Sequence, residues 1–369
     1  MNLKRIKAFF KLIAINISIV YALLMITNLI ISKDDITEEH IIVNVKKYGS
    51  NKNYSGVIDN DFHRRDGKVD SVFQITTGYL GDIKLERSFN SSSDKIDYLF
   101  MGGSTTACVY INPQMRFPFL INKSLDDSIN VINLSKEGKH SHHSFLQLNT
   151  QLNETQINNL ILMHNVNDLA HLLYFNSYTK GISTRRSVIE YDDLLEINKK
   201  PFYLPVNVID KLKQSISQLY PNMYNNIKKV NLLSFLKNVD EFQNYRTKKN
   251  KIDEVIFKKF ENNLNLFVST TSIRGTNLIL MTQFNRFTPY DSFVRREYNE
   301  SKNVLSYENF IFAYERFNDI IRKVASENDL KLVDLDSLIP KNKEYMYDSV
   351  HLTEKGSVLV SEVILKHLE

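Results

Sequence analysis

Five short apolar runs divide the chain between residues 97 and 335. They read DYLFM, INVINL, NLILMH, NLILMTQ and KLVDL, at residues 97–101, 129–134, 159–164, 277–283 and 331–335. Each run is continuously apolar rather than alternating, which is the pattern of strands buried on both faces of a parallel sheet. Helical patterns separate the runs, as at 309–328. Strands that alternate with helices predict a three-layer α/β sandwich.

The interval between the third and fourth runs is too long for a single crossover connection. It extends from about 165 to 276, so we expect part of it to be a helical insertion, placed at about 172–250. Its clearer helical patterns lie at 210–220 and 251–269. Insertions at this edge of a parallel sheet often shape the substrate site.

The residues before the first run show a different pattern. Residues 12–31 carry no charge, and a helix of that length, at ~1.5 Å per residue, matches the ~30 Å hydrocarbon core of a membrane. Basic residues precede this stretch and acidic residues follow it, which predicts a cytoplasmic N-terminus and an extracytoplasmic remainder. A cleaved signal peptide is the alternative. An anchor is favoured, because the apolar stretch is long and no A-x-A cleavage site follows it.

We therefore expect a single-pass membrane protein in three parts. Residues 1–32 form a cytoplasmic tail and transmembrane anchor. Residues 33–95, polar and rich in turns, form a β-rich spacer or small subdomain, and residues 96–369 form the sandwich with its insertion.

Charge and cysteine content narrow the range of functions. The net charge is +5, and all but one of these charges is accounted for by Lys4, Arg5, Lys7 and Lys11. The rest of the chain has no basic excess that would indicate a nucleic-acid partner. Cys108 is the single cysteine, which excludes an internal disulfide and a cysteine-rich zinc site.

Candidate chemistry begins where the first apolar run ends. The stretch FMGGSTTACVY at 100–110 breaks on two glycines and offers Ser104 at the strand's carboxyl end, the edge at which open α/β sheets bind ligands. A serine hydroxyl needs a base to become a nucleophile. Asp348 lies three residues before His351, just ahead of a helix that Thr353 could cap. One loop could thus hold a base and the carboxylate that orients it, although a simple turn is the plainer interpretation of this motif alone.

Two further segments lie at the same predicted edge. Gly138 follows the second run, where its backbone N–H could approach a substrate oxygen, and Asn167 follows the third, where its side-chain amide could donate. With the Ser104 N–H they would make a three-donor oxyanion hole. Each also has a structural interpretation, Gly138 as a helix stop and Asn167 with Asp168 as a helix cap. The common edge of all four segments favours a site.

Ser104, Gly138, Asn167 and His351, in this order, resemble the four signature blocks of the SGNH (GDSL-type) hydrolases, over residues ~95–369. The resemblance implies a flavodoxin-like α/β/α sandwich with five parallel strands. It also implies Ser104 as nucleophile, Asp348 and His351 as the rest of a catalytic triad, and Ser104 N–H, Gly138 N–H and the Asn167 side chain as oxyanion donors.

Two positions depart from the family pattern. The first block reads Gly-Gly-Ser-Thr, so Gly103 stands in place of the usual aspartate, and the glycine of the third block is Asn165, a residue able to adopt a left-handed backbone. Asp168 completes the Asn-Asp pair of that block. Such Gly-Gly-Ser variants resemble the branch found among enzymes that modify envelope polysaccharides.

Five histidines lie close to these segments: His140, His142, His143, His164 and His171. No cysteine and no H-E-x-x-H pattern accompanies them, so we expect polar groups that face the substrate rather than metal ligands. We predict no metal and no cofactor.

These observations predict a serine esterase that removes O-acyl groups, above all O-acetyl groups, from an envelope or capsular polysaccharide. Two alternatives remain open: a polysaccharide O-acetyltransferase with the same triad, and a catalytically inactive, membrane-anchored glycan-binding protein. A lipid-directed esterase is disfavoured, because the insertion has polar and basic stretches such as 246–251 rather than a continuous apolar lid. The expected partners are an acylated glycan and the membrane, and the sequence gives no oligomeric state.

Overall fold

The computed structural model describes residues 15, 16, 19, 45–57, 66, 72–85, 95–179, 252–301 and 303–368. The chain divides into two compact units, Met1–Ile42 and Val43–Glu369. Every strand and helix given below belongs to the second unit.

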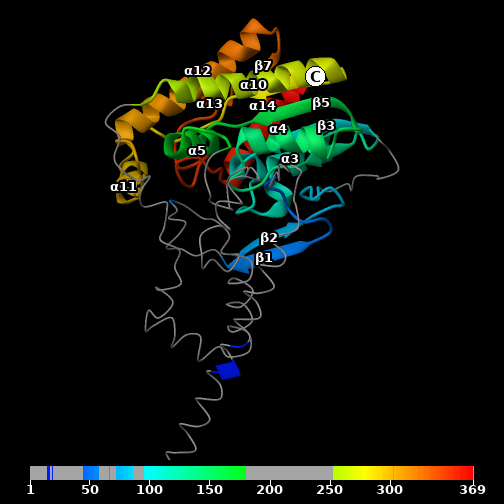
Figure 1. Cartoon of the computed structure of the whole chain (residues 1–369), viewed down its shortest axis with the longest axis horizontal. Coiled ribbons are helices and arrows are strands. Elements are labelled where there is room, and N and C mark those ends of the chain that lie inside the picture. Colours follow the sequence, from blue (N-terminus) through cyan, green and yellow to red (C-terminus); the bar gives the residue numbers. More distant parts are fainter. Residues whose placement is uncertain are drawn as a thin grey trace, which may run out of the picture. The chain divides into compact units, whose positions relative to one another are not determined.

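The main sheet has five parallel strands in the order β4-β3-β5-β6-β7. The strands are β3 (Lys95–Gly102), β4 (Val131–Asn133), β5 (Gln156–Met163), β6 (Asn277–Met281) and β7 (Lys331–Val333). Each overlaps one of the five predicted apolar runs, so the prediction of a parallel α/β sandwich is confirmed. Figure 1 shows this sheet between its helices.

Both faces of the sheet are buried, which explains why the strands are apolar throughout. Leu99 and Met101 of β3 point into one hydrophobic cluster, and Phe100 between them points into the other. The first cluster is covered by α4 (Ser141–Thr150), α5 (Val166–Phe175), α10 (Val255–Arg274) and α12 (Tyr307–Glu327). The second is covered by α3 (Phe117–Ser124) and α14 (Glu354–Leu368).

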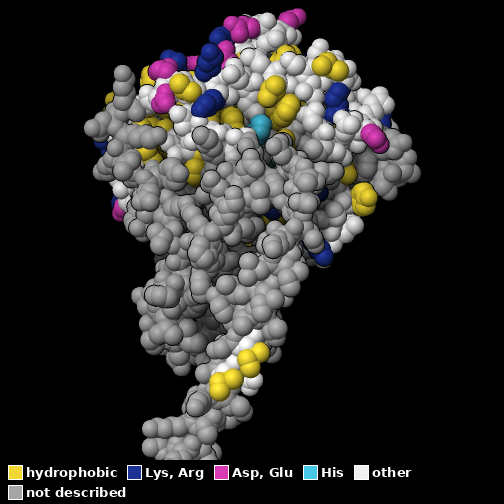
Figure 2. Space-filling view, viewed as in Figure 1, with side chains coloured by type: hydrophobic (Ala, Val, Ile, Leu, Met, Phe, Trp, Pro, Cys, Tyr) yellow, Lys and Arg dark blue, Asp and Glu magenta, His cyan; other side chains and the backbone are white. Residues whose placement is uncertain are grey.

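Helix α12 matches the pattern predicted at 309–328 and begins where Ser306 caps it by accepting from the Asn309 N–H at 3.2 Å. Its Phe317 ring stacks on Phe260 of α10, with the ring centroids 4.3 Å apart. On the outer side, charged side chains of both signs are interspersed over this helical layer (Figure 2). The shorter helices are α2 (Ser104–Ala107), η1 (Pro113–Met115), α11 (Ser292–Glu300) and α13 (Leu335–Leu338).

One assignment to the insertion is wrong. The pattern at 251–269, which we attributed to inserted sequence, forms α10, and this helix packs against α4, α5, α12 and β6 as part of the sandwich. Its apolar residues face the sheet, which a single amphipathic pattern cannot distinguish from packing within an insertion. The pattern at 210–220 lies outside the described residues.

The described part of the N-terminal segment contains two strands. β1 (Asn53–Val57) and β2 (Val72–Thr76) form a two-stranded antiparallel sheet. Ile75 and Ile83 of this segment share a small hydrophobic cluster with Ala107 and Val109, which follow Ser104 in the chain. The Ile83 N–H donates to Asn133 O at the end of β4, at 2.8 Å. The segment therefore packs directly on the sandwich.

Among the residues that the structure describes, no helix is long and apolar enough to cross a membrane. Of the predicted span at 12–31, only residues 15, 16 and 19 are described. The anchor therefore stays a prediction.

Candidate active site

Ser104 stands at the first position of α2, directly after β3. The turn between the two elements has no room for side chains. A Cβ on Gly102 would come within 2.0 Å of the Thr106 Oγ1 and 2.9 Å of the Met163 carbonyl oxygen. Glycine at 102 thus lets the chain turn sharply at the end of the buried strand and leaves the Ser104 side chain partly exposed.

Ser104, His351 and Asp348 form one continuous hydrogen-bonded chain. The His351 Nε2 lies 2.8 Å from the Ser104 Oγ, and its Nδ1 lies 2.7 Å from the Asp348 Oδ2. The His351 side chain is 19% exposed and that of Asp348 10%. A hydroxyl, an imidazole and a carboxylate in this order are the geometry of an activated serine nucleophile.

The loop that carries His351 is shaped by its own aspartate. The other carboxylate oxygen of Asp348 accepts the backbone N–H groups of Val350 and His351, at 2.9 and 2.7 Å, which closes a tight turn. Thr353 then caps α14 as expected, because its Oγ1 accepts from the Gly356 N–H at 3.1 Å. Asp348 is therefore a turn residue and also the partner of His351.

His351 and Asp348 each shift the pKa of the other. Burial lowers the pKa of His351, but the adjacent Asp348 charge and hydrogen bond outweigh it and leave that pKa above its ordinary value. Burial raises the pKa of Asp348, yet His351 and the two backbone N–H groups hold it below its ordinary value. The carboxylate is thus ionised whenever the imidazole is available as a base.

Aromatic side chains surround the imidazole. The Tyr347 ring stacks on His351 with centroids 5.7 Å apart, and the partly exposed Tyr110 meets it edge-on at 6.4 Å. Phe73 of β2 packs edge-on against Tyr110 at 6.0 Å. The N-terminal segment therefore contributes to the surroundings of the base.

The predicted oxyanion donors lie around the same turn. The Asn167 Nδ2 donates to the Lys139 carbonyl oxygen at 3.0 Å. A Cβ on Gly103 would come within 2.3 Å of that Nδ2 and 3.3 Å of the Lys139 oxygen. Gly138, beside Lys139, has φ +65°, a left-handed conformation that glycine adopts without strain. An amide carries two N–H groups, and the bond to Lys139 O uses one of them.

The close contact also explains the first departure from the family pattern. Gly103 lies against the Asn167 amide, where any side chain would displace the amide. The role of Ser104 N–H, Gly138 N–H and Asn167 as donors stays a prediction.

Asp168 is buried within the molecule rather than exposed at the site. It accepts hydrogen bonds from the Ser141 N–H at 3.0 Å, the Ser141 hydroxyl and the Tyr178 hydroxyl at 2.7 Å. Burial raises its pKa to about 6, and these hydrogen bonds limit the rise. Asp168 thereby fixes the first turn of α4 to α5, just beyond the loop that carries Gly138.

One possibility and one expectation about this region do not hold. Asn165 has φ −161° and ψ −76°, so it does not use the left-handed backbone open to it, and its side chain is buried in bonds to α12. The histidines do not face a substrate: His140, His143, His164 and His171 are each at most 3% exposed. His140 stacks on His143, with centroids 4.2 Å apart, and packs against His171 and Tyr178. His142 is partly buried and bonds to Asn263.

The structure also identifies a residue that sequence patterns did not indicate. Arg286, 5% exposed, forms ion pairs with Asp66 at 2.7 Å and Asp291 at 2.5 Å. Its backbone N–H donates to Ser349 O at 2.8 Å, and the Asp66 N–H donates to Tyr347 O at 2.8 Å. Together they hold the loop that carries the base. No motif marks Arg286, because Asp66 and Ser349 are distant from it in sequence.

Comparisons with known proteins give structural likeness alone. An acetyl xylan esterase, AlAXEase, is 15% identical, with a TM-score of 0.41 over 74% of this chain and 100% of that chain. A lipase/acylhydrolase from Enterococcus faecalis is 12% identical, with a TM-score of 0.40 over 74% and 95%. Axe2, an acetylxylan esterase from Geobacillus stearothermophilus, is 12% identical, with a TM-score of 0.39 over 74% and 94%.

No family model matches the chain. No curated protein matches it either. The functional assignment therefore depends on the geometry of the site.

Gly103→Ala tests the close packing around the nucleophile. Its added methyl would overlap the Asn167 amide, so we expect a loss of about 1–3 kcal/mol in the free energy of unfolding, measured by urea denaturation. The same substitution combined with Asn167→Ala should cost clearly less than it does alone, because the overlapping group is gone. Equal costs in both backgrounds would contradict this packing.

Lys139 should make stability depend on pH. Burial, aided by the charges of Lys136 and Lys47, lowers the pKa of its ammonium to about 7. The unfolded chain keeps this proton up to about pH 10.4, so the free energy of unfolding rises with pH between these values. From pH 7.5 to 9.5 the wild type should gain about 1–3 kcal/mol more than Lys139→Met in urea denaturation. An equal change in the free energy of unfolding of the two proteins over this pH range would contradict the lowered pKa of Lys139.

Proposed function

We propose that this protein is a serine esterase that removes O-acyl groups, above all O-acetyl groups, from an envelope or capsular polysaccharide. The observation that carries the proposal is the hydrogen-bonded chain from the Ser104 Oγ through His351 to Asp348. The residues around it supply what acyl transfer requires: a partly exposed nucleophile, an ionised carboxylate and amide donors beside the nucleophile.

The reaction begins when the Ser104 Oγ attacks the ester carbonyl carbon and its proton passes to the His351 Nε2. The negative charge that develops on the carbonyl oxygen is bound by the N–H groups of Ser104, Gly138 and Asn167. The tetrahedral intermediate collapses, the C–O bond to the sugar breaks, and His351 returns the proton to the departing hydroxyl. An acyl-serine remains.

Water then attacks the acyl-serine, with its proton taken by His351, and the carboxylic acid leaves as Ser104 recovers its proton. Throughout, Asp348 accepts from the Nδ1–H and stabilises the charged imidazole. A sugar hydroxyl in place of water would make the same site an O-acetyltransferase, because the acceptor depends on how well the site excludes water.

The glycan part of the proposal comes from the sequence. The stretch at 12–31 would anchor the protein with its N-terminus in the cytoplasm and the catalytic unit outside, where envelope polysaccharides are met. The Gly-Gly-Ser-Thr block resembles the polysaccharide-modifying branch of the SGNH hydrolases.

Ser104→Ala should lower the turnover of an activated acetyl ester by about 10³-fold or more, measured with the full-length protein purified in detergent. A fluorophosphonate probe should label the wild type on Ser104 and leave Ser104→Ala unlabelled, as shown by mass spectrometry of the labelled peptide. Adding an oligosaccharide tests the acceptor: free acetate alone indicates hydrolysis, and acetylated sugar indicates transfer. An unlabelled wild type would support the inactive glycan-binding alternative.

The rate should also fall at acid pH as His351 gains a proton. The pKa of its imidazole lies above the ordinary value of about 6.5, so the acid limb of kcat/KM should have its midpoint above pH 6.5. In Asp348→Asn the charge that raises this pKa is lost while burial remains. We therefore expect a limb at lower pH and a rate lowered by about 10²–10⁴-fold. An acid limb unmoved by the substitution would exclude Asp348 as the partner that raises this pKa.

A further inference from the structure

Helix α5 is capped by a side chain from the segment that follows a neighbouring strand. It starts at Val166, and the preceding Asn165 makes no side-chain cap hydrogen bond. The Val166 N–H donates to the side-chain Oε1 of Gln283 at 3.1 Å. Gln283 lies two residues beyond the end of β6, so the position of α5 depends on that neighbouring segment.

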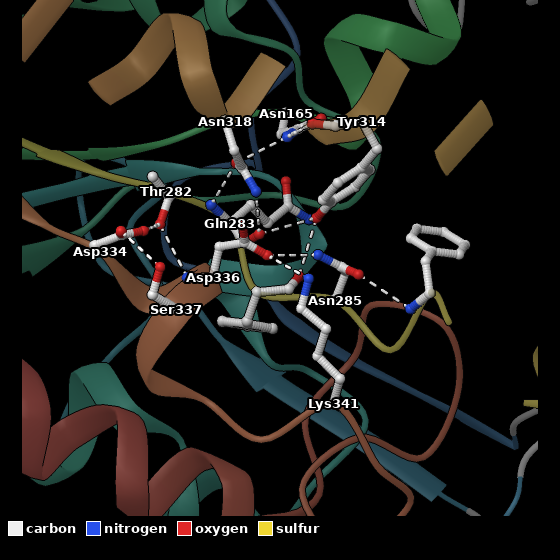
Figure 3. Close-up of polar contacts among 12 residues, drawn as sticks. Asn165, Thr282, Gln283, Asn285, Tyr314, Asn318, Asp334, Asp336, Ser337 and Lys341 are labelled. Carbon is white, nitrogen blue, oxygen red and sulfur yellow. Dashed lines mark hydrogen bonds and ion pairs between the residues drawn. The ribbon is translucent and has the colours of Figure 1, made fainter. Parts of the chain in front are cut away.

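The Asn318 side chain joins α5 and the β6 segment, as Figure 3 shows. Its Oδ1 accepts from the Asn165 Nδ2 at 2.9 Å and from the Gln283 N–H at 3.0 Å, and its Nδ2 donates to Gln283 O at 3.0 Å. The Asn165 Nδ2 also donates to Tyr314 O on α12, at 3.0 Å. We call Asn165, Gln283 and Asn318 the amide relay.

The relay is buried. Asn318 is 0% exposed, and Asn165 and Gln283 are each 1% exposed, so water does not compete for their hydrogen bonds. Loss of the Asn318 amide would leave the Gln283 N–H buried without its hydrogen bond and the Asn165 Nδ2 with Tyr314 O alone, which favours a shift of the chain.

The relay ends beside the proposed oxyanion hole. Asn165 is two residues from Asn167, whose amide reaches Lys139 O and lies against Gly103. The other end of the relay continues from Gln283 along the chain to Arg286, whose N–H donates to Ser349 O in the loop of the base. The relay thus connects the third oxyanion donor to the loop that holds His351.

We propose that Asn318, acting through Asn165 and Gln283, is a positioning residue that sets the place of the Asn167 amide relative to Ser104. This role rests on the proposed esterase function. It also explains why an asparagine replaces glycine at 165: its side chain, not a left-handed backbone, fixes the start of α5.

The decisive experiment is a double-mutant cycle on the full-length protein with an acetyl ester substrate. Asn318→Leu should lower kcat by about 10–100-fold with little change in KM, less than the ~10²–10³-fold typical of removing an oxyanion donor outright. In the Asn167→Ala background the same substitution should change kcat less than about twofold, because the amide that it misplaces is already absent.

Two further variants separate positioning from loss of stability. Phe317→Leu weakens the packing of α12 without removing a relay hydrogen bond, so it should lower Tm and leave kcat at 25 °C unchanged. Gln283→Met removes the cap on Val166 and should lower kcat as Asn318→Leu does. It therefore tests the relay at a second position and replaces Asn318→Leu if Asn318→Leu does not fold.

The outcomes are distinguishable. If Asn318→Leu lowers kcat equally in the wild type and in the Asn167→Ala background, the positioning role is overturned and the esterase function stands. A kcat that neither relay substitution lowers would do the same. A wild type without turnover would overturn the proposed function and this role with it.

Discussion

The hydrogen bond between the Ser104 Oγ and the His351 Nε2 joins residues 247 positions apart, and the remaining features of the site are arranged so that it can form. It requires the carboxyl end of β3 and the loop before α14 to meet at one edge of the sheet. The hydrophobic cluster beneath that edge includes Phe100 of β3 and Val360 of α14, so burial of apolar side chains holds the two segments together.

Above the apolar layer, the interior at this edge is unusually polar. Asp168, Lys139 and four histidines are buried there, and each places a charge or a polar group where water is absent. Such groups are tolerated when they are hydrogen-bonded, and here Asp168 joins α4 to α5 while Lys139 bonds to Leu134 O and Gln147. The amide relay belongs to this layer. Buried polar contacts fix the loops at the ends of the strands more narrowly than apolar packing alone, because each requires a defined direction.

The N-terminal segment contributes more than a spacer would. Its residues contact the turn after Ser104, the loop of Gly138 and the loop of His351. Arg116 donates to Cys108 O, Val109 O and Gln74 O, the Tyr48 hydroxyl bonds to Glu137, and Asp66 pairs with Arg286. Three loops from different strands are thus braced by one preceding segment.

The sequence by itself determined the sheet, its parallel strands and the segments that carry Ser104, Gly138, Asn167 and His351. These follow from apolar runs and turn residues, which are local and periodic signals. Asn318 also had a local signal, since it lies in the apolar stripe of 309–328 with Tyr314, Phe317 and Ile321. The partners of Arg286, the burial of the histidines, the backbone of Asn165 and the place of α10 in the sandwich were decided only by the tertiary structure. Each depends on contacts between residues far apart in the chain, and a hydrophobic pattern shows that a face is buried without showing what covers it.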